Sequence, residues 1–282
     1  MTTTSASPAD LLPELERYYD TAPRRGGARA EDFGPLTLFV QESAGWPYYA
    51  RPALAGEGDG RGAPAGPSVS DVERVLARQR ELRVPESFEW VAETTPSLRA
   101  AAEAAGLQVH EHPLMVLDTS AMRTPAHPEV RVLDAADPLL RAAVTVPMLA
   151  FAAPGTAVGG AGPAELAVAE RDPASEGRRV RVSEMIASGR TALAAAVSGG
   201  VVLCSGQHNP VGDVTEIVGV GTLPSARRRG LGLAVTAALV ADALAHGART
   251  VFLSAGDEDV ARIYARLGFR RAGTALIAER PL

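Results

Sequence analysis

The sequence predicts an α/β protein in which a mixed, mostly antiparallel sheet is flanked by helices, with a smaller α/β domain before it. Three observations carry this prediction. The chain has 282 residues, enough for two domains of ordinary size. Segments with strand and helix patterns alternate along it, which favours helices layered on a sheet. Three apolar segments between residues 190 and 223 are separated by short turns, as in an antiparallel meander.

The domain boundary is expected near residue 125, because two prolines and several polar residues gather in residues 122–130, as in a linker. The two domains would then be residues 1–125 and 126–282. In the first domain, β-rich runs and capping residues followed by apolar periodicity indicate the order strand, strand, helix, strand, helix, strand. These elements fall at residues 36–40, 46–50, 68–82, 87–93, 95–106 and 107–118.

The second domain starts with a strand and two helices, and a glycine-rich loop at residues 154–165 separates the helices. The expected strands lie at residues 130–133, 190–198, 201–207, 214–223, 250–255 and 274–279, and the helices at 138–152, 173–187, 225–247 and 259–268. The helical period predicts that Leu233, Ala237, Val240 and Leu244 face the sheet. Val235 and Leu239 would then lie on another side of that helix.

Composition excludes several classes of protein. No run approaches the ~20 apolar residues of a membrane-spanning helix, and the N-terminus does not resemble a secretory signal. We therefore expect a cytoplasmic protein with no membrane partner. A net charge of −5 makes it a poor general binder of nucleic acid. Cys204 is the one cysteine, which excludes a disulfide framework and a cysteine-rich zinc site, and no metal site is expected elsewhere.

The most informative part of the sequence joins the last strand of the meander to the long helix. Gly230 and Gly232 leave the main chain bare where the helix begins, and the first N–H groups of a helix have no partner within it. With the helix dipole they can form a cradle for a diphosphate. Arg227, Arg228 and Arg229 add positive charge beside it. The pattern is neither a Walker loop nor a Rossmann fingerprint. A capped helix after a basic turn is the alternative interpretation.

Arg227-x-x-Gly230-x-Gly232 resembles the Arg/Gln-x-x-Gly-x-Gly/Ala motif of the GNAT superfamily of acetyl-CoA-dependent N-acetyltransferases. Residues 263–269, Ile-Tyr-Ala-Arg-Leu-Gly-Phe, resemble the second motif of that family, Leu-Tyr-x-x-x-Gly-Phe. The resemblance covers residues 128–282. The first domain resembles a degenerate GNAT half that lacks the Arg-x-x-Gly-x-Gly junction, as in tandem GNAT proteins.

This resemblance implies that acetyl-CoA is the acyl donor and that the meander's last strand separates from the next strand to admit the pantetheine arm. Glycine within that strand is consistent with a close approach of a ligand. Asp257 stands where many family members carry an asparagine that contacts the cofactor. The implied cofactor-binding residues are Val220, Gly221, Thr222, Arg227, Arg228, Arg229, Gly230, Leu231, Gly232, Leu233 and Asp257.

Two residues are candidates for proton transfer. Tyr264 occupies the position where the family has a tyrosine near the CoA sulfur, and a phenol is protonated at neutral pH. Glu216 lies where some members carry a glutamate base, and the strand period places it on one face with Val218, Val220 and Thr222. A core tyrosine and a solvated glutamate are the alternatives. Cys204 is expected to be a small core residue, and His208 a surface residue at a hairpin tip.

The expected activity is transfer of an acetyl group to a primary amine of a small molecule or peptide, by direct attack in a ternary complex. A non-catalytic acyl-CoA-binding module is the alternative. Longer acyl chains and acceptors other than amines stay open, because loops that vary within one fold shape the acceptor site. The oligomeric state cannot be derived from the sequence, and a homodimer is one option.

Overall fold

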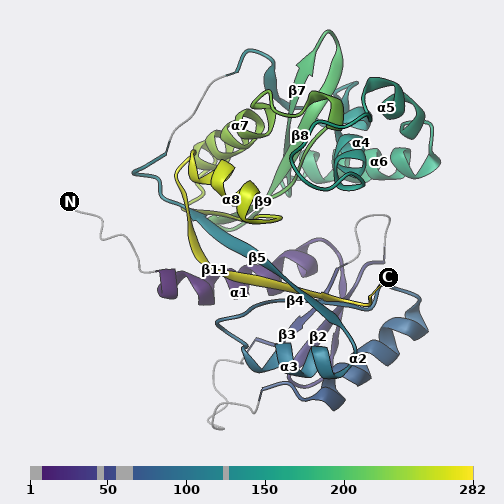
Figure 1. Cartoon of the computed structure of the whole chain (residues 1–282), viewed down its shortest axis with the longest axis vertical. Coiled ribbons are helices and arrows are strands. Elements are labelled where there is room, and N and C mark those ends of the chain that lie inside the picture. The colour runs from purple at the N-terminus through teal and green to yellow at the C-terminus, as the bar shows by residue number, and fades with distance from the viewer. Residues whose placement is uncertain (1–7, 43–47, 55–65, 123–126, 282) are drawn as a thin grey trace. The chain divides into compact units, whose positions relative to one another are not determined.

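The structure, a computed structural model, describes residues 8–42, 48–54, 66–122 and 127–281. The chain forms two compact units (Figure 1). The first comprises Met1–Leu114 and Arg271–Leu282, and the second comprises Met115–Arg270. The boundary expected near residue 125 lies outside the described residues.

The first unit contains a sheet with strand order β1-β2-β3-β4-β11-β5. Its elements are α1 (Pro8–Arg25), β1 (Arg29–Asp32), β2 (Leu36–Val40), β3 (Ala50–Pro52), α2 (Val69–Leu82), β4 (Ser87–Val91), α3 (Ser97–Ala104), and most of β5 (Gln108–Leu117) and β11 (Phe269–Glu279). The chain leaves this unit within β5 and returns to it within β11. The sequence predicted neither α1 nor β1. Of the strand expected at residues 46–50, residues 46–47 lie outside the described residues, residues 48–49 are not in a strand, and β3 begins only at Ala50.

Local signals explain the elements that were predicted in this unit. Ser68 and Asp71 form a capping box at the start of α2: the Ser68 side chain accepts a bond from the Asp71 N–H, and the Ser68 N–H donates to the Asp71 carboxylate at 2.8 Å. All five residues of β2 are buried, which explains why four of them are apolar and only Thr37 is polar. Trp90 and Phe88 of β4 are fully buried in the same core.

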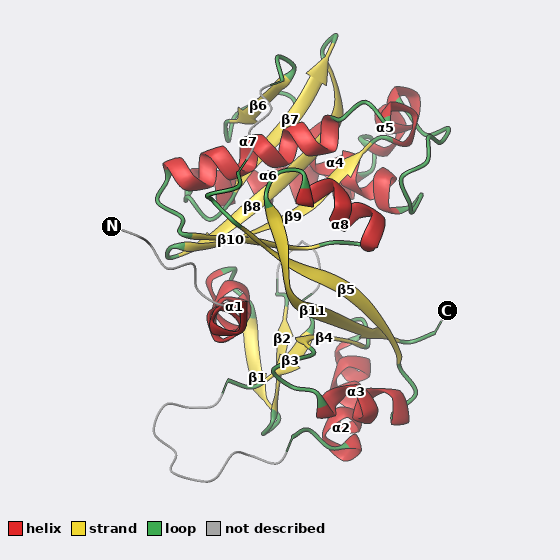
Figure 2. Cartoon of the chain, turned by 60° about the vertical axis from the view of Figure 1, so that its left-hand side comes forward, coloured by secondary structure: helices red, strands yellow, loops and turns green. Residues whose placement is uncertain are grey.

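The second unit has the strand order β5-β10-β9-β8-β7-β6, in which β6 to β9 are antiparallel and β9 and β10 are parallel. Its elements (Figure 2) are β6 (Val130–Leu133), α4 (Leu140–Phe151), α5 (Pro163–Ala169), α6 (Pro173–Ala187), β7 (Ala192–Ser198), β8 (Val201–Val211), β9 (Val214–Thr222), α7 (Leu231–Ala245), β10 (Thr250–Ser254) and α8 (Glu258–Ala265). The predicted fold class, a mixed and mostly antiparallel sheet flanked by helices, is confirmed. Helix α5 lies partly within the segment that was expected to be a loop.

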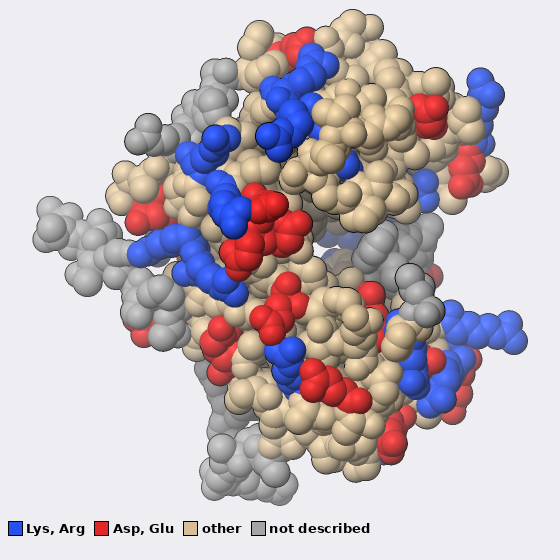
Figure 3. All heavy atoms as spheres, viewed as in Figure 1, with Lys and Arg blue, Asp and Glu red and all other residues tan. Residues whose placement is uncertain are grey.

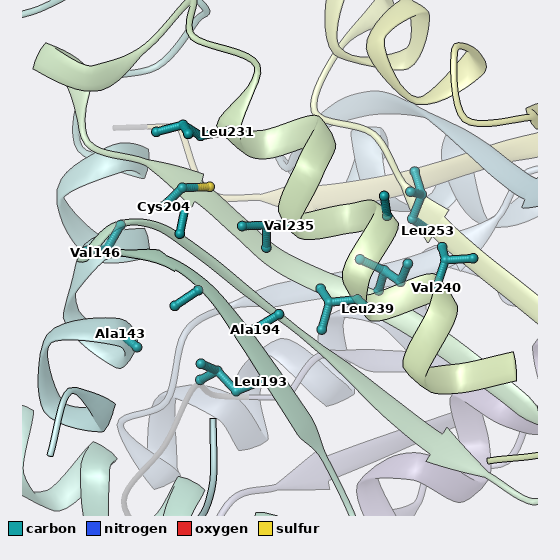
Figure 4. Packing of buried hydrophobic residues seen from close by; sticks show 14 of the residues in the cluster. Ala143, Val146, Leu193, Ala194, Cys204, Leu231, Val235, Leu239, Val240 and Leu253 are labelled. Atoms are coloured by element: carbon teal, nitrogen blue, oxygen red, sulfur yellow. The ribbon is translucent and has the colours of Figure 1, made fainter. Parts of the chain in front are cut away.

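Helices α7 and α4 cover opposite faces of this sheet, and glycines mark both contacts. A Cβ added at Gly206 of β8 would lie 3.3 Å from Leu239 of α7, and one added at Gly221 of β9 would lie 2.8 Å from the Cα of Pro147 in α4. Val235 and Leu239 are fully buried against the strands (Figure 4). The expectation that they lie on another side of α7 is therefore wrong. None of the described helices has the length and apolarity needed to cross a bilayer.

Many of the surface arginines are paired with acidic side chains. In the first unit, Arg78 lies 2.8 Å from Glu31, and Arg24 lies 2.8 Å from Asp20. Charged side chains of both signs are visible on the face shown in Figure 3, among a larger uncharged surface. Exposed pairs of this kind contribute only about 0–1 kcal/mol each to stability. The buried cores, and not these pairs, hold each unit together.

Candidate functional site

Strands β9 and β10 separate part-way along their length. They pair in parallel over three residues, and the last pair is Glu216 opposite Phe252. β9 nevertheless continues to Thr222, and β8 stays paired with it as far as Cys204 opposite Thr222. Among the described residues, β10 therefore leaves one main-chain edge of residues 217–222 unpaired. The strand separation that the sequence resemblance implied is confirmed.

A β-bulge interrupts β9 just after this point. His208 pairs with Ile217 and Cys204 pairs with Thr222, so β9 has one residue more than β8 between these pairs. Gly219 has a φ of +65°, a left-handed conformation that favours glycine. An extra residue shifts the alternation of side chains between the two faces of the sheet. The bulge thereby sets which side chains of β9 face α7.

Glu216 lies on the opposite face of the sheet from Thr222. The Thr215 hydroxyl is 2.9 Å from Nδ1 of His208 on the α7 side, and Glu216, the next residue along the strand, faces the α4 side. Beyond the bulge, Thr222 faces α7, because a Cβ added at Gly232 of α7 would lie 3.6 Å from its Oγ1. The expectation that Glu216 shares a face with Val220 and Thr222 is wrong, because strict alternation does not hold across a bulge.

The turn between β9 and α7 exposes main-chain donors. Arg228 and Gly230 have left-handed backbones, with φ of 66° and 77°, and both are exposed. Within the part of the chain that the structure describes, no backbone hydrogen bond uses an N–H of residues 228–233. A Cβ added at Gly230 would meet nothing within 4 Å, so the space beside this residue is open. The N-terminus of a 15-residue helix adds partial positive charge, so the turn can bind an anion.

The side chains around this turn differ from the sequence expectation in their contacts. The Arg227 guanidinium donates to the backbone carbonyl oxygens of Ala150, Ala153 and Ala157, at 2.8, 2.6 and 3.1 Å. The Asp257 carboxylate accepts the Val260 N–H at 2.8 Å and caps α8. Both side chains therefore have partners within the protein. Exposed Arg228 and Arg229 are the arginines whose charge faces solvent beside the turn, and Arg229 lies 3.9 Å from Glu129.

Tyr264 of α8 is buried within the second unit and has 9% of its surface exposed. Burial raises the pKa of its phenol, nearby Cys204 raises it further, and a hydrogen bond with Thr236 of α7 acts in the opposite direction. The phenol therefore stays protonated well above neutral pH. Its ring packs edge-on against Phe269, with 6.1 Å between the ring centroids.

Comparison with known proteins agrees with this geometry. Residues 208–277 match the sequence model of the family described as FR47-like protein. A GCN5-related N-acetyltransferase from Kribbella flavida superposes with a TM-score of 0.66 at 22% identity, over 96% of each chain. The fold is that of the GCN5-related N-acetyltransferases. At this identity the likeness is one of fold, and no curated protein sequence matches the chain.

Two further structures extend this GNAT likeness along the chain. A GCN5-related N-acetyltransferase from Sphaerobacter thermophilus has a TM-score of 0.52 at 17% identity and covers 98% of this chain and 95% of its own. A tandem GNAT protein from the clavulanic acid biosynthesis pathway, solved without AcCoA, has a TM-score of 0.55 at 16% identity, over 86% of this chain and 77% of its own. The resemblance predicted from the two motifs is thus confirmed at the level of the fold.

The cysteine of this GNAT fold is a core residue, as expected. Cys204 is fully buried beside Leu231 and Val235 of α7 (Figure 4), and its Sγ accepts a hydrogen bond from Thr222 at 3.2 Å. Burial raises the pKa of its thiol to about 12. Because the thiolate is the reactive form, such a thiol is inert at neutral pH.

We therefore predict that a thiol reagent does not label the folded protein. At pH 8, 5,5′-dithiobis(2-nitrobenzoate) should release less than one-tenth of an equivalent of chromophore in an hour, and one equivalent once guanidinium chloride unfolds the chain. Since the chain has a single cysteine, Cys204→Ala is a complete blank for this assay. Rapid labelling of the folded protein would show that the thiol is accessible and would reopen a covalent cysteine mechanism.

His208 is buried and not at a hairpin tip, so its expected surface position is wrong. Strand β8 continues through it to Val211, and the turn consists of residues 212–213 alone. His208 has 2% of its surface exposed, and its Nε2 lies 3.0 Å from the carboxylate of Asp242 on α7. The GNAT fold here holds no group of three or more His, Cys, Asp or Glu side chains suited to a metal, as far as the described residues extend.

The burial of His208 predicts a loss of stability in acid. Burial lowers its pKa below the ordinary 6.5, although the nearby Asp242 carboxylate acts against this shift. Below pH 6.5, His208 therefore binds more protons in the unfolded chain than in the folded one. As the pH is lowered, this difference reduces the free energy of unfolding by at most about 1.4 kcal/mol per pH unit. Denaturant titrations between pH 5 and 8 should show this slope. It should be shallower in His208→Asn and unchanged in His110→Asn, a control at an exposed histidine of β5.

Proposed function

We propose that this GNAT-fold chain transfers an acetyl group from acetyl-CoA to a primary amine of a small molecule or peptide in the cytoplasm. The observation that carries the proposal is the junction of β9 and α7. There, the unpaired main-chain edge of residues 217–222 leads directly into the open N–H groups of residues 228–233. Acetyl-CoA would supply the activated thioester acyl group.

The residues present suit such a donor. The N–H groups of residues 228–233 would hold the diphosphate, with charge from Arg228 and Arg229 nearby. Main-chain groups of residues 220–222 would bond the pantetheine arm, and an N–H among them would stabilise the negative charge that develops on the thioester oxygen. A Cβ added at Gly219 would meet nothing within 4 Å, and Gly232 has no side chain beside Thr222 and Val220.

Two side chains would move protons. The Tyr264 phenol would donate its proton to the departing sulfur, and its raised pKa keeps that proton in place at neutral pH. Glu216 would accept the proton of the amine, directly or through water. It lies in the last β9–β10 pair, at the point where the two strands separate and the proposed donor site begins. The high pKa of Cys204 supports direct attack by the amine in a ternary complex over a covalent cysteine intermediate.

The test has two stages. Titration calorimetry with CoA should give a heat of binding, and acetyl-CoA with a panel of small and peptide amines should then release free thiol. No heat on adding CoA would contradict the donor site. Tight CoA binding without thiol release from any amine, and without an effect of Tyr264→Phe, would instead establish a non-catalytic acyl-CoA-binding module.

A further inference from the structure

The last residues of α4 and the loop that follows it, together residues 150–161, are attached to the turn that begins the proposed donor site. Two backbone hydrogen bonds connect them in opposite directions. The Gly159 N–H donates to the Pro224 carbonyl at 3.0 Å, and the Ser225 N–H donates to the Ala161 carbonyl at 2.9 Å. Both elements belong to the second unit, although about 65 residues separate them in the sequence. The segment and the turn therefore share one hydrogen-bonded contact.

Arg227 provides the largest part of this attachment. Its NH2 nitrogen donates to the carbonyls of Ala150 and Ala153, and its NH1 nitrogen donates to that of Ala157. The last carbonyls of a helix have no partner within it and carry partial negative charge, so a guanidinium at the end of α4 is well matched to them. One side chain thus holds the end of α4 and the following loop together.

Glycines make the contact close. A Cβ added at Gly159 would lie 3.0 Å from the Cβ of Pro224, and one added at Gly162 would lie 2.6 Å from the Oγ of Ser225. Neither residue has a left-handed backbone, so the requirement for glycine there is one of space. The loop therefore lies against residues 224–225 without room for larger side chains.

We propose that Arg227 is a positioning residue that clamps residues 150–161 onto the turn at 228–233, and that its side chain does not bind phosphate. The main chain of the turn would bind the anion while the Arg227 side chain transmits this event to the segment. Binding at the turn and order in the segment are then coupled, and such coupling is reciprocal. The identity of the anion as the CoA diphosphate rests on the proposed function; the clamp itself does not.

Hydrogen–deuterium exchange of the full chain tests the clamp. In the free protein, Arg227→Ala should speed exchange of the amides in residues 150–161 at least tenfold, while Arg249→Ala, a control at an exposed arginine of the same unit outside the proposed site, leaves them unchanged. With CoA added, exchange in this segment should slow in the wild type and in Arg249→Ala, but not in Arg227→Ala. Millimolar methylguanidinium should restore slow exchange in Arg227→Ala. Arg227→Lys keeps a positive charge and should give an exchange rate between those of the wild type and Arg227→Ala. It replaces the alanine variant in this test if Arg227→Ala does not fold.

Two results would overturn the inference. One is unchanged exchange of residues 150–161 in both Arg227 variants. The other is loss of CoA binding in Arg227→Ala with the segment as protected as in the wild type, since that would make Arg227 a phosphate ligand. If the wild type binds no CoA, the proposed function fails, and the free-protein comparison of the Arg227 and Arg249 variants still decides whether the clamp exists.

Discussion

Replacing Tyr264 with phenylalanine is expected to lower kcat for acetyl transfer by about 10²- to 10⁴-fold, the range typical of a lost general acid. The ring stays in place against Phe269, and only the hydroxyl is removed, so the dissociation constant for CoA should change less than threefold. Thiol release with acetyl-CoA and a reactive amine, together with CoA calorimetry, measures both quantities. Because burial raises the pKa of this phenol, ionisation of Tyr264 should not reduce activity up to about pH 10.

Two variants separate chemistry from packing in this prediction. Tyr18→Phe removes a hydroxyl from another buried tyrosine, in the first unit, and should leave kcat unchanged. Thr236→Val removes the hydroxyl that bonds to Tyr264 and should lower kcat only when Tyr264 is present, so that the double variant is no slower than Tyr264→Phe. A kcat for Tyr264→Phe within threefold of the wild type would make Tyr264 a core residue without a role in proton transfer.

Replacing Gly232 with valine should raise the dissociation constant for CoA at least about 30-fold, or ~2 kcal/mol. The added Cβ would lie 3.6 Å from the Thr222 hydroxyl and 4.0 Å from Val220, which are ordinary contacts. The protein should therefore fold, since valine is no worse than glycine within a helix. The branched side chain would, however, obstruct the main-chain edge that we assign to the pantetheine arm. Titration calorimetry and thermal unfolding measure the two effects separately.

Ala241→Val is the matched control, because it introduces the same side chain on the exposed side of α7. It should leave CoA binding as in the wild type. Equal affinity in Gly232→Val and Ala241→Val would refute the assignment of the turn and strand edge as the donor site. A large fall in the unfolding temperature of Gly232→Val alone would show that position 232 matters for packing instead.

Elements with local signals could be predicted from the sequence. Helix α2 begins after Ser68, which forms a capping box with Asp71, and β2 coincides with the strand expected at residues 36–40. Helix α1 could not be predicted in this way, because Pro13 and Pro23 lie inside it and argue against a helix locally. Burial of Leu15 and Tyr18 in the first unit outweighs that local penalty.

The candidate site shows the same division. The glycines at the start of α7 could be read as an open anion-binding turn, because backbone freedom and the ends of helices are properties of short segments. The contacts of His208 could not be predicted from the sequence, since its partner Asp242 lies 34 residues away on another element. Strict alternation along β9 likewise misplaced Glu216, because the bulge at Gly219 becomes visible only in the pairing with β8.

The sequence by itself determined the fold class, the order of most elements and the bare turn of residues 228–233, since each of these depends on patterns within a few neighbouring residues. Only the tertiary structure decided which face of β9 carries Glu216, how deeply Tyr264 and Cys204 are buried, and what Arg227 binds. The carbonyls that accept the hydrogen bonds of Arg227 come from residues 70 to 77 positions earlier. Such partners are brought together by packing of the whole unit, which local sequence patterns do not record.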